Sequence, residues 1–182
     1  LWLRGKCPGC HRKISWRYPA IEVLTALLSV MVAYQFGVSS AAFWGLILTW
    51  VLIALSFIDI DHQILPDVMT LPLLWLGLLL SVGSVYVGAS ESIVGAAVGY
   101  LSLWMVYHIF RLLTGKEGMG FGDFKLLAVL GAWLGWQSLP VIILFSSFAG
   151  ALIGISLVVV LGRDKNVPIP FGPYLAIAGW CA

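Results

Sequence analysis

Four aspartates of this 182-residue chain occur in two short motifs that border long apolar segments. Asp59, Asp61 and Asp67 lie in S-F-I-D-I-D-H-Q-I-L-P-D, at the end of an apolar run. Asp123 lies in G-M-G-F-G-D-F-K, directly before another apolar run. Because ionisable groups at membrane depth are costly, a functional role is the default hypothesis for such residues.

Asp59 and Asp123 are predicted to lie near the same membrane boundary on different helices, where their carboxyls can meet. Two close carboxyls in a poorly solvated site share one proton near neutral pH. The ionised member can deprotonate a water while the protonated member polarises a scissile carbonyl, which is aspartic peptide hydrolysis. The alternative is structural, because aspartates also cap helices or face water. Asp67 fits a helix start after a proline, and Asp61 fits a solvated loop.

The residues around Asp123 allow two interpretations each. Gly118, Gly120 and Gly122 alternate, and such spacing lets the backbone approach an extended substrate closely or simply forms a flexible loop. Lys125 is predicted either to hold a carboxylate or a substrate carbonyl, or to extend its ammonium to the membrane interface.

Composition sets the environment in which these groups act. The chain is 61% apolar and 10% charged, with a mean hydropathy of +1.02, whereas a soluble domain carries about 25% charged residues. This excludes a soluble monomer, a disordered chain and a protein that binds nucleic acid through bulk charge.

The apolar segments predict an all-α polytopic membrane protein with about six to seven transmembrane helices. The segment before Pro140 is short and contains Gly131 and Gly135, so we expect it to be tilted, broken or partly buried by its neighbours. The predicted segments are 19–36, 41–58, 68–87, 92–112, 125–137, 139–161 and 170 onward.

The basic residues predict the orientation. All ten Lys and Arg lie in or at the edge of 1–18, 59–67, 113–124 and 162–169. Cytoplasmic loops carry such an excess of positive charge, so these segments and both aspartate motifs are expected on the cytoplasmic side. We expect 1–18 to be the end of a cytoplasmic loop and 19–182 to be a multi-helix membrane peptidase domain.

Five motifs in order resemble the type IV prepilin peptidases, polytopic bacterial membrane proteases of the GxGD aspartic class. They are C-P-G-C at 7–10, W-R-Y-P-A-I-E at 16–22, D-I-D-H-Q-I-L-P-D at 59–67, G-F-G-D-F-K at 120–125 and P-F-G-P-Y-L-A at 170–176. Together they cover nearly the whole chain.

The resemblance implies that Asp59 and Asp123 are the catalytic aspartates. From the residues themselves we expect Gly120, Gly122, Lys125 and Asp67 to shape or support the site. The resemblance implies cleavage, after a glycine, of the basic leader of type IV prepilins and type II secretion pseudopilins. The reaction would occur at the cytoplasmic side of the bacterial inner membrane, among its lipids, with no cofactor for proteolysis. The resemblance also permits methylation of the new N-terminus with S-adenosylmethionine, for which no residue is assigned.

Cys7 and Cys10 form one CxxC pair, which is half of a possible zinc site; two reduced cytoplasmic thiols are the alternative. In the resembled family a second CxxC lies upstream. Because the chain begins at Leu1 and ends inside an apolar run, we expect it to be a piece of a longer protein.

Two other classes of function compete with a protease. Membrane aspartates also build proton-coupled transporters, but here they lie at one membrane edge and no inverted repeat is apparent. A non-catalytic membrane assembly factor would explain the hydropathy, but it leaves the glycine-flanked Asp123 and its partner without a role.

Overall fold

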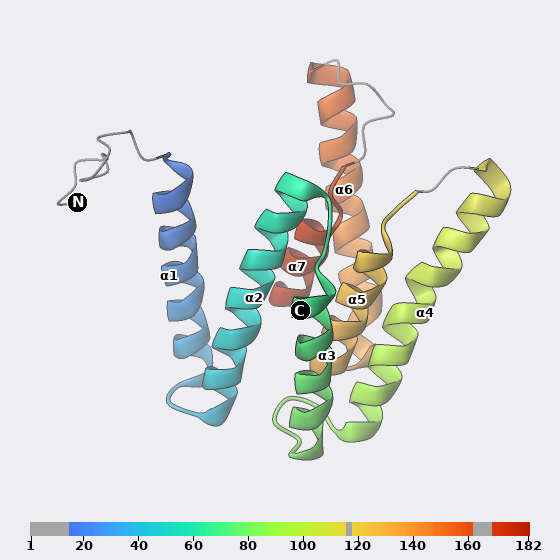
Figure 1. The fold of residues 1–182 in the computed structure, drawn as a ribbon. Helices are drawn as coiled ribbons and strands as arrows, with labels where there is room; N and C mark the ends of the chain where they lie inside the picture. Colours follow the sequence, from blue (N-terminus) through green and yellow to red (C-terminus); the bar gives the residue numbers. More distant parts are fainter. Residues whose placement is uncertain (1–14, 116–117, 162–168) are drawn as a thin grey trace. The chain divides into compact units, whose positions relative to one another are not determined.

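The computed structural model describes residues 15–115, 118–161 and 169–182, and within these ranges the chain is helical without strands. The predicted all-α class is confirmed, because each predicted apolar segment corresponds to one helix (Figure 1). The helices are α1 (Arg17–Phe36), α2 (Ser40–His62), α3 (Asp67–Val82), α4 (Ala89–Thr114), α5 (Phe121–Leu134), α6 (Leu139–Leu161) and α7 (Gly172–Cys181), with a 3-10 turn η1 (Trp136–Ser138) before α6.

Four helical segments of the described chain are long and apolar enough to cross a membrane, which agrees with a multi-pass membrane protein. They are α1, α2, α4 and the segment Trp136–Leu157. The remaining helices are shorter: α3 has 16 residues, α5 has 14 and α7 has 10. At about 1.5 Å per residue, these helices are shorter than the roughly 30 Å of a hydrocarbon core.

The chain divides into two compact units, residues 1–50 and residues 51–182. In the first unit, the indole N–H of Trp50 on α2 donates a hydrogen bond of 3.0 Å to Ser29 Oγ on α1. The second unit contains the rest of α2 and all of α3 to α7, and it carries both aspartate motifs.

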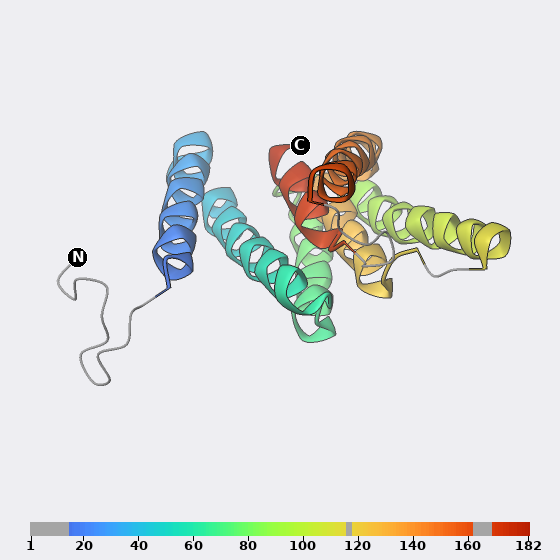
Figure 2. The ribbon, with the colours of Figure 1, turned by 90° about the horizontal axis from the view of Figure 1, so that it is seen from above.

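Helix α5 is the centre of the second unit. Its residues 126–133 are all buried, and it contacts α3, α4, α6 and α7; Figure 2 shows it among these helices. The prediction that this short apolar segment is buried by its neighbours is therefore confirmed. Because its side chains contact protein on every side, the position of its first turn is fixed by packing.

Small residues let α4 approach α5 closely. Gly95 lies against the backbone of Gly131, and Gly99 lies against the backbone of Leu127. One turn before Gly95, the Ser92 hydroxyl donates a buried hydrogen bond of 2.6 Å to the Ala132 carbonyl. Small residues at a helix interface allow this backbone contact, which in lipid replaces the hydrophobic effect as a source of helix association.

Helix α3 is joined to the other end of α5 through Trp133. The side chain of Trp133 is 1% exposed, and its indole N–H donates a hydrogen bond of 2.9 Å to the Leu73 carbonyl. The same indole lies against Gly77, where an added Cβ would be 2.5 Å from a ring carbon. The buried indole N–H thus has a hydrogen-bond partner, and α5 is held by α4 on one side and by α3 on another.

Candidate active site

Asp59 lies in the last turn of α2, just beyond residue 58, where the predicted apolar segment ends. Helix α2 continues to His62 and ends where Gln63 adopts a φ of 55°, with the Gln63 N–H bonded to the Asp59 carbonyl at 2.8 Å. The prediction that Asp61 lies in a loop is therefore wrong, because Asp61 is helical. The prediction that its side chain is solvent-exposed agrees with the structure. Asp59 is only 5% exposed, because its side chain faces the neighbouring helices.

The backbone of α7 contacts Asp59 directly. The N–H of Gly172 donates a buried hydrogen bond of 2.9 Å to Asp59 Oδ2. The sequence predicted that Pro170, Gly172 and Pro173 open the last helix with a kinked start that could close over the active site, but it did not predict a hydrogen bond from Gly172 to Asp59. The available signal was a glycine between two prolines at a helix start, which is typical of a close backbone approach.

Asp123 lies in the first turn of α5, which follows the N-cap residue Gly120. Its side chain is 6% exposed. An aromatic cluster holds this turn from the α4 side: the ring of Tyr107 lies 5.2 Å from Phe121 and 5.7 Å from Phe124, centre to centre. Such contacts bury large apolar area and leave the carboxyl at a fixed place.

The two aspartates, 64 positions apart in the sequence (123 − 59), interact electrostatically. The pKa of Asp123 is raised to about 7, chiefly by burial and next by the negative charge of Asp59, against a smaller lowering by the Gly120 backbone. Two buried carboxyls that influence each other ionise one after the other. The fold thus brings together the pair that the sequence had predicted to meet.

The two glycines of the GxGD motif have different surroundings. A Cβ on Gly122 would be 2.7 Å from Leu65 Cβ, so Gly122 is required for packing against the α2–α3 connection. A Cβ on Gly120 would have no heavy atom closer than 3.9 Å. Leu65 also packs on Gly172, whose added Cβ would be 3.3 Å from Leu65 Cδ1. Leu65 therefore lies between the starts of α5 and α7.

Lys125 and Asp67 form an ion pair beside this site. Lys125 Nζ lies 2.6 and 2.7 Å from the two carboxylate oxygens of Asp67. The sequence left open whether Lys125 binds a carboxylate, binds a substrate carbonyl or extends to the membrane interface. In the structure it binds the carboxylate of Asp67. Helix α3 begins at Asp67 as predicted, with Pro66 as its N-cap and no side-chain capping bond.

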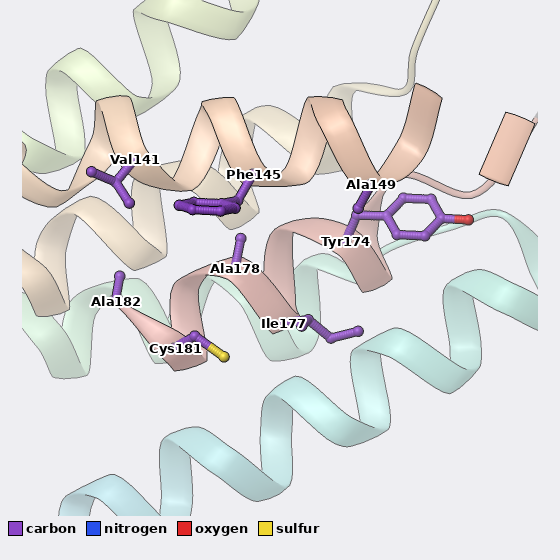
Figure 3. Close-up of a pocket in the computed structure, with 8 residues that line it drawn as sticks. All are labelled: Val141, Phe145, Ala149, Tyr174, Ile177, Ala178, Cys181 and Ala182. Carbon is purple, nitrogen blue, oxygen red and sulfur yellow. The ribbon is translucent and has the colours of Figure 1, made fainter. Parts of the chain in front are cut away.

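An apolar groove of about 440 Å³ lies between α6 and α7 (Figure 3). Neither aspartate lines it. Tyr174, one of its residues, follows Gly172 by two positions on α7. The groove is lined by Val141, Phe145, Ala149, Tyr174, Ile177, Ala178, Cys181 and Ala182.

In the described ranges, no group of three or more His, Cys, Asp or Glu side chains is arranged to hold a metal ion. Cys7 and Cys10, the predicted half of a zinc site, lie outside the residues that the structure describes.

These features define a class: a helical, multi-pass membrane protein with two buried aspartates at helix ends whose charges interact. Residues 46–155 match the type IV leader peptidase family, and residues 1–36 match the bacterial Peptidase A24 N-terminal domain. The chain belongs to the type IV leader peptidase family. This confirms the family to which the sequence motifs pointed.

Proteins of three bacteria illustrate the similarity, each over the whole of this chain. It is 58% identical to the prepilin leader peptidase/N-methyltransferase of Aeromonas hydrophila. It is 56% identical to the protein of that name in Stutzerimonas stutzeri and 55% identical to the one in Pseudomonas aeruginosa. The chain spans 63% of the length of each of these relatives. No solved structure matches it.

Proposed function

We propose that this chain forms the peptidase part of an aspartic membrane endopeptidase that removes the leader of type IV prepilins, with Asp59 and Asp123 as the catalytic pair. The observation that carries the proposal is the burial of both carboxyls, from α2 and α5, within electrostatic reach of each other. Membership of the type IV leader peptidase family supports the same reaction. The names of the relatives add the substrate class.

The proposed chemistry uses one proton shared by the pair. The ionised carboxylate removes a proton from a water molecule, whose oxygen bonds to the scissile carbonyl carbon. The protonated carboxyl gives its proton to the carbonyl oxygen. When the resulting tetrahedral carbon releases the amine, the amine leaves with a proton from the carboxyl that took it from water, and the other carboxyl regains its own.

The side of the membrane follows from the charge distribution. The Lys and Arg residues gather in segments on one side of the predicted spans, together with both aspartate motifs, so the site faces the cytoplasm of the bacterial inner membrane. A substrate with a basic leader in the cytoplasm and an apolar helix in the bilayer would present its cleavage point, after a glycine, at this level. Pseudopilins of type II secretion share that form and are the second proposed substrate class.

A second reaction and a metal site are also proposed for the whole protein. The relatives are also named N-methyltransferases, so we infer that the full protein methylates the new N-terminal amine, with S-adenosylmethionine supplying the methyl group.

Cys7 and Cys10 have the spacing for two thiolate ligands of a tetrahedral zinc ion, the other ligands coming from outside this chain. Metal analysis of the full-length protein with and without Cys7→Ser and Cys10→Ser tests the zinc proposal.

The test of proteolysis uses the full-length protein in membranes with a leader-bearing prepilin, and mass spectrometry to detect the released leader. Asp59→Asn and Asp123→Asn should each lower the rate by about a thousandfold or more, because general acid–base catalysis contributes 10²–10⁴. Asp61→Asn is the matched control, since Asp61 is an exposed aspartate two residues from Asp59 on the same helix.

The same variants separate the competing classes. Full cleavage by Asp59→Asn or Asp123→Asn would refute the assignment of the pair. Folded wild-type protein that cleaves no prepilin but takes up a solute with protons would be a transporter. Wild-type protein that does neither, and whose role in pilus assembly both aspartate variants retain, would be an assembly factor.

A further inference from the structure

We propose that the backbone N–H of Gly172 keeps Asp59 ionised, so that Asp59 is the base that takes the proton from water and Asp123 is the acid. This assignment of roles rests on the proposed function of the pair. It makes Gly172 a positioning residue of the active site and gives the P-F-G-P motif a task in the chemistry.

Burial by itself does not distinguish the two aspartates, because Asp59 is 5% exposed and Asp123 is 6% exposed. Their backbone contacts do differ in origin, because the Gly120 backbone acts on Asp123 from the start of the same helix, whereas Asp59 has a donor from another helix. Asp59 Oδ2 accepts the Gly172 N–H at 2.9 Å in a buried setting. A hydrogen bond from a backbone N–H to a carboxylate is charge-assisted and favours the ionised form over the neutral one.

The first turn of α7 is arranged so that Gly172 is the donor available for this contact. Tyr174 and Leu175 both direct their N–H groups to the Phe171 carbonyl, at 3.1 and 3.2 Å. Pro173 has no N–H to donate. Gly172 is the first residue of the helix, where an N–H has no partner within the helix. Asp59 supplies that partner, and the positive end of the helix dipole adds to its preference for negative charge.

The contact also explains why this position is glycine. A Cβ on residue 172 would lie 2.8 Å from Asp59 Oδ2 and 3.3 Å from Leu65 Cδ1. Any side chain would therefore push the carboxylate away from the N–H. The close approach needs glycine for space rather than for an unusual backbone angle.

The charged groups around the pair agree with this assignment. Asp123, on α5, is the titratable group on which the charge of Asp59 acts, and its pKa is raised to about 7, chiefly by burial. Lys125, the nearest cation along α5, is bound to Asp67. When Asp59 is already ionised, Asp123 retains the proton.

Two reagents of opposite selectivity test the assignment in the full-length protein. An epoxide is opened by a carboxylate: a carbon–oxygen bond of the ring breaks, an ester bond forms, and the alkoxide takes a proton from water. A diazoacetyl ester instead needs a protonated carboxyl, whose proton moves to the diazo carbon before nitrogen leaves and the ester forms. Peptide mapping by mass spectrometry then identifies the labelled aspartate.

We expect the epoxide on Asp59 and the diazoacetyl ester on Asp123, each with at least tenfold preference. Reversed or equal labelling would overturn the proposal. Where neither reagent enters the site, infrared spectroscopy decides: Asp123→Asn should remove a protonated-carboxyl band at neutral pH, and Asp59→Asn should not. The opposite pattern would also overturn it.

Variants of Gly172 test the positioning role. Gly172→Pro removes the N–H at a helix position that tolerates proline, and it should reduce the epoxide preference for Asp59 at least tenfold. The acid limb of the cleavage profile should move to higher pH, because a carboxylate without its donor holds a proton more tightly. Gly172→Ala keeps the N–H and should lower the rate with a smaller movement of that limb.

Gly88→Pro is the control, because Gly88 is the glycine N-cap of α4 and has open space around it. The labelling and the acid limb of this variant should match those of the wild type. An unmoved acid limb in folded Gly172→Pro would overturn the positioning role. If the Gly172 variants do not fold, wild-type labelling decides. Selective labelling without cleavage would refute the proposed function alone, whereas cleavage with reversed labelling would refute only this assignment.

Discussion

Lys125 Nζ binds both carboxylate oxygens of Asp67, at 2.6 and 2.7 Å, across 58 positions of sequence. The pair joins the start of α5 to the start of α3. Because Lys125 follows Asp123 by two residues, the contact restrains the turn that carries the buried carboxyl. The site is thus held from α3 by an ion pair, from α4 by aromatic rings and from α7 by a backbone N–H.

We expect this ion pair to contribute little to stability. The Lys125 and Asp67 side chains are 28% and 55% exposed, and pairs at such positions contribute about 0.2–1 kcal/mol. Lys125→Met and Asp67→Asn should therefore each lower the free energy of unfolding by about that amount. In a double-mutant cycle the two effects should be less than additive, and the coupling should weaken with salt. Strictly additive effects would contradict a direct pair.

The pH dependence of cleavage should show a limb near pH 7. The pKa of Asp123 is raised from 3.8 to about 7. Below about pH 7, Asp123 therefore carries the proton that the reaction needs. As the pH rises through about 7, Asp123 loses this proton and the rate should fall about tenfold per pH unit. Initial rates at saturating prepilin over a pH series measure it. A rate that stays constant well above pH 7 would contradict a protonated Asp123.

The two glycines of the GxGD motif should respond differently to alanine. At Gly122 the added Cβ would be 2.7 Å from Leu65 Cβ, and overpacking of this kind lowers the free energy of unfolding by about 1–3 kcal/mol. At Gly120 the nearest atom would be 3.9 Å away, so stability should change by less than about 0.5 kcal/mol. Thermal unfolding of the two variants in the same detergent compares them. Equal losses would show that the loop packs differently.

The close contact of α4 and α5 should be sensitive to a single methyl group. A Cβ on Gly95 would meet the backbone of Gly131, which has no side chain to move aside. Gly95→Ala should therefore separate the helices and lower the free energy of unfolding by about 1–3 kcal/mol. Gly88→Ala, near the start of the same helix, meets no atom within 4 Å and should unfold like the wild type.

The helices could be predicted from sequence because hydropathy is a local property, and each of the predicted apolar segments became a helix. The boundary of α2 was less accessible. Its predicted end at residue 58 rested on the change from apolar to charged residues, but the backbone continues to His62. The helical backbone continues through Asp59 and Asp61, and the Gln63 N–H still bonds to the Asp59 carbonyl. Side-chain polarity alone does not fix where a helix ends.

The meeting of Asp59 and Asp123 was predictable, because Asp59 follows one apolar run and Asp123 precedes another on the same side of the predicted spans. The Gly172–Asp59 hydrogen bond joins residues 113 positions apart and has no local signature. It depends on how α7 packs against α2, which one sequence does not state. The same holds for the burial of Gly122 against Leu65, since the glycine pattern fits a flexible loop equally well.

The burial of residues 126–133 of α5 separates two kinds of apolar sequence within one chain. Its side chains Leu126, Leu127, Val129 and Leu130 are 0% exposed, so they meet only protein, whereas Leu101 and Met105 on α4 are 53% and 57% exposed on a surface where a bilayer would lie. In a library of substitutions, tolerance on α5 should follow side-chain volume, as in the interior of a water-soluble enzyme. On the outer face of α4 it should follow only affinity for lipid. One chain would thus contain a close-packed interior and a lipid-facing surface, and only the interior would determine where the two carboxyls meet.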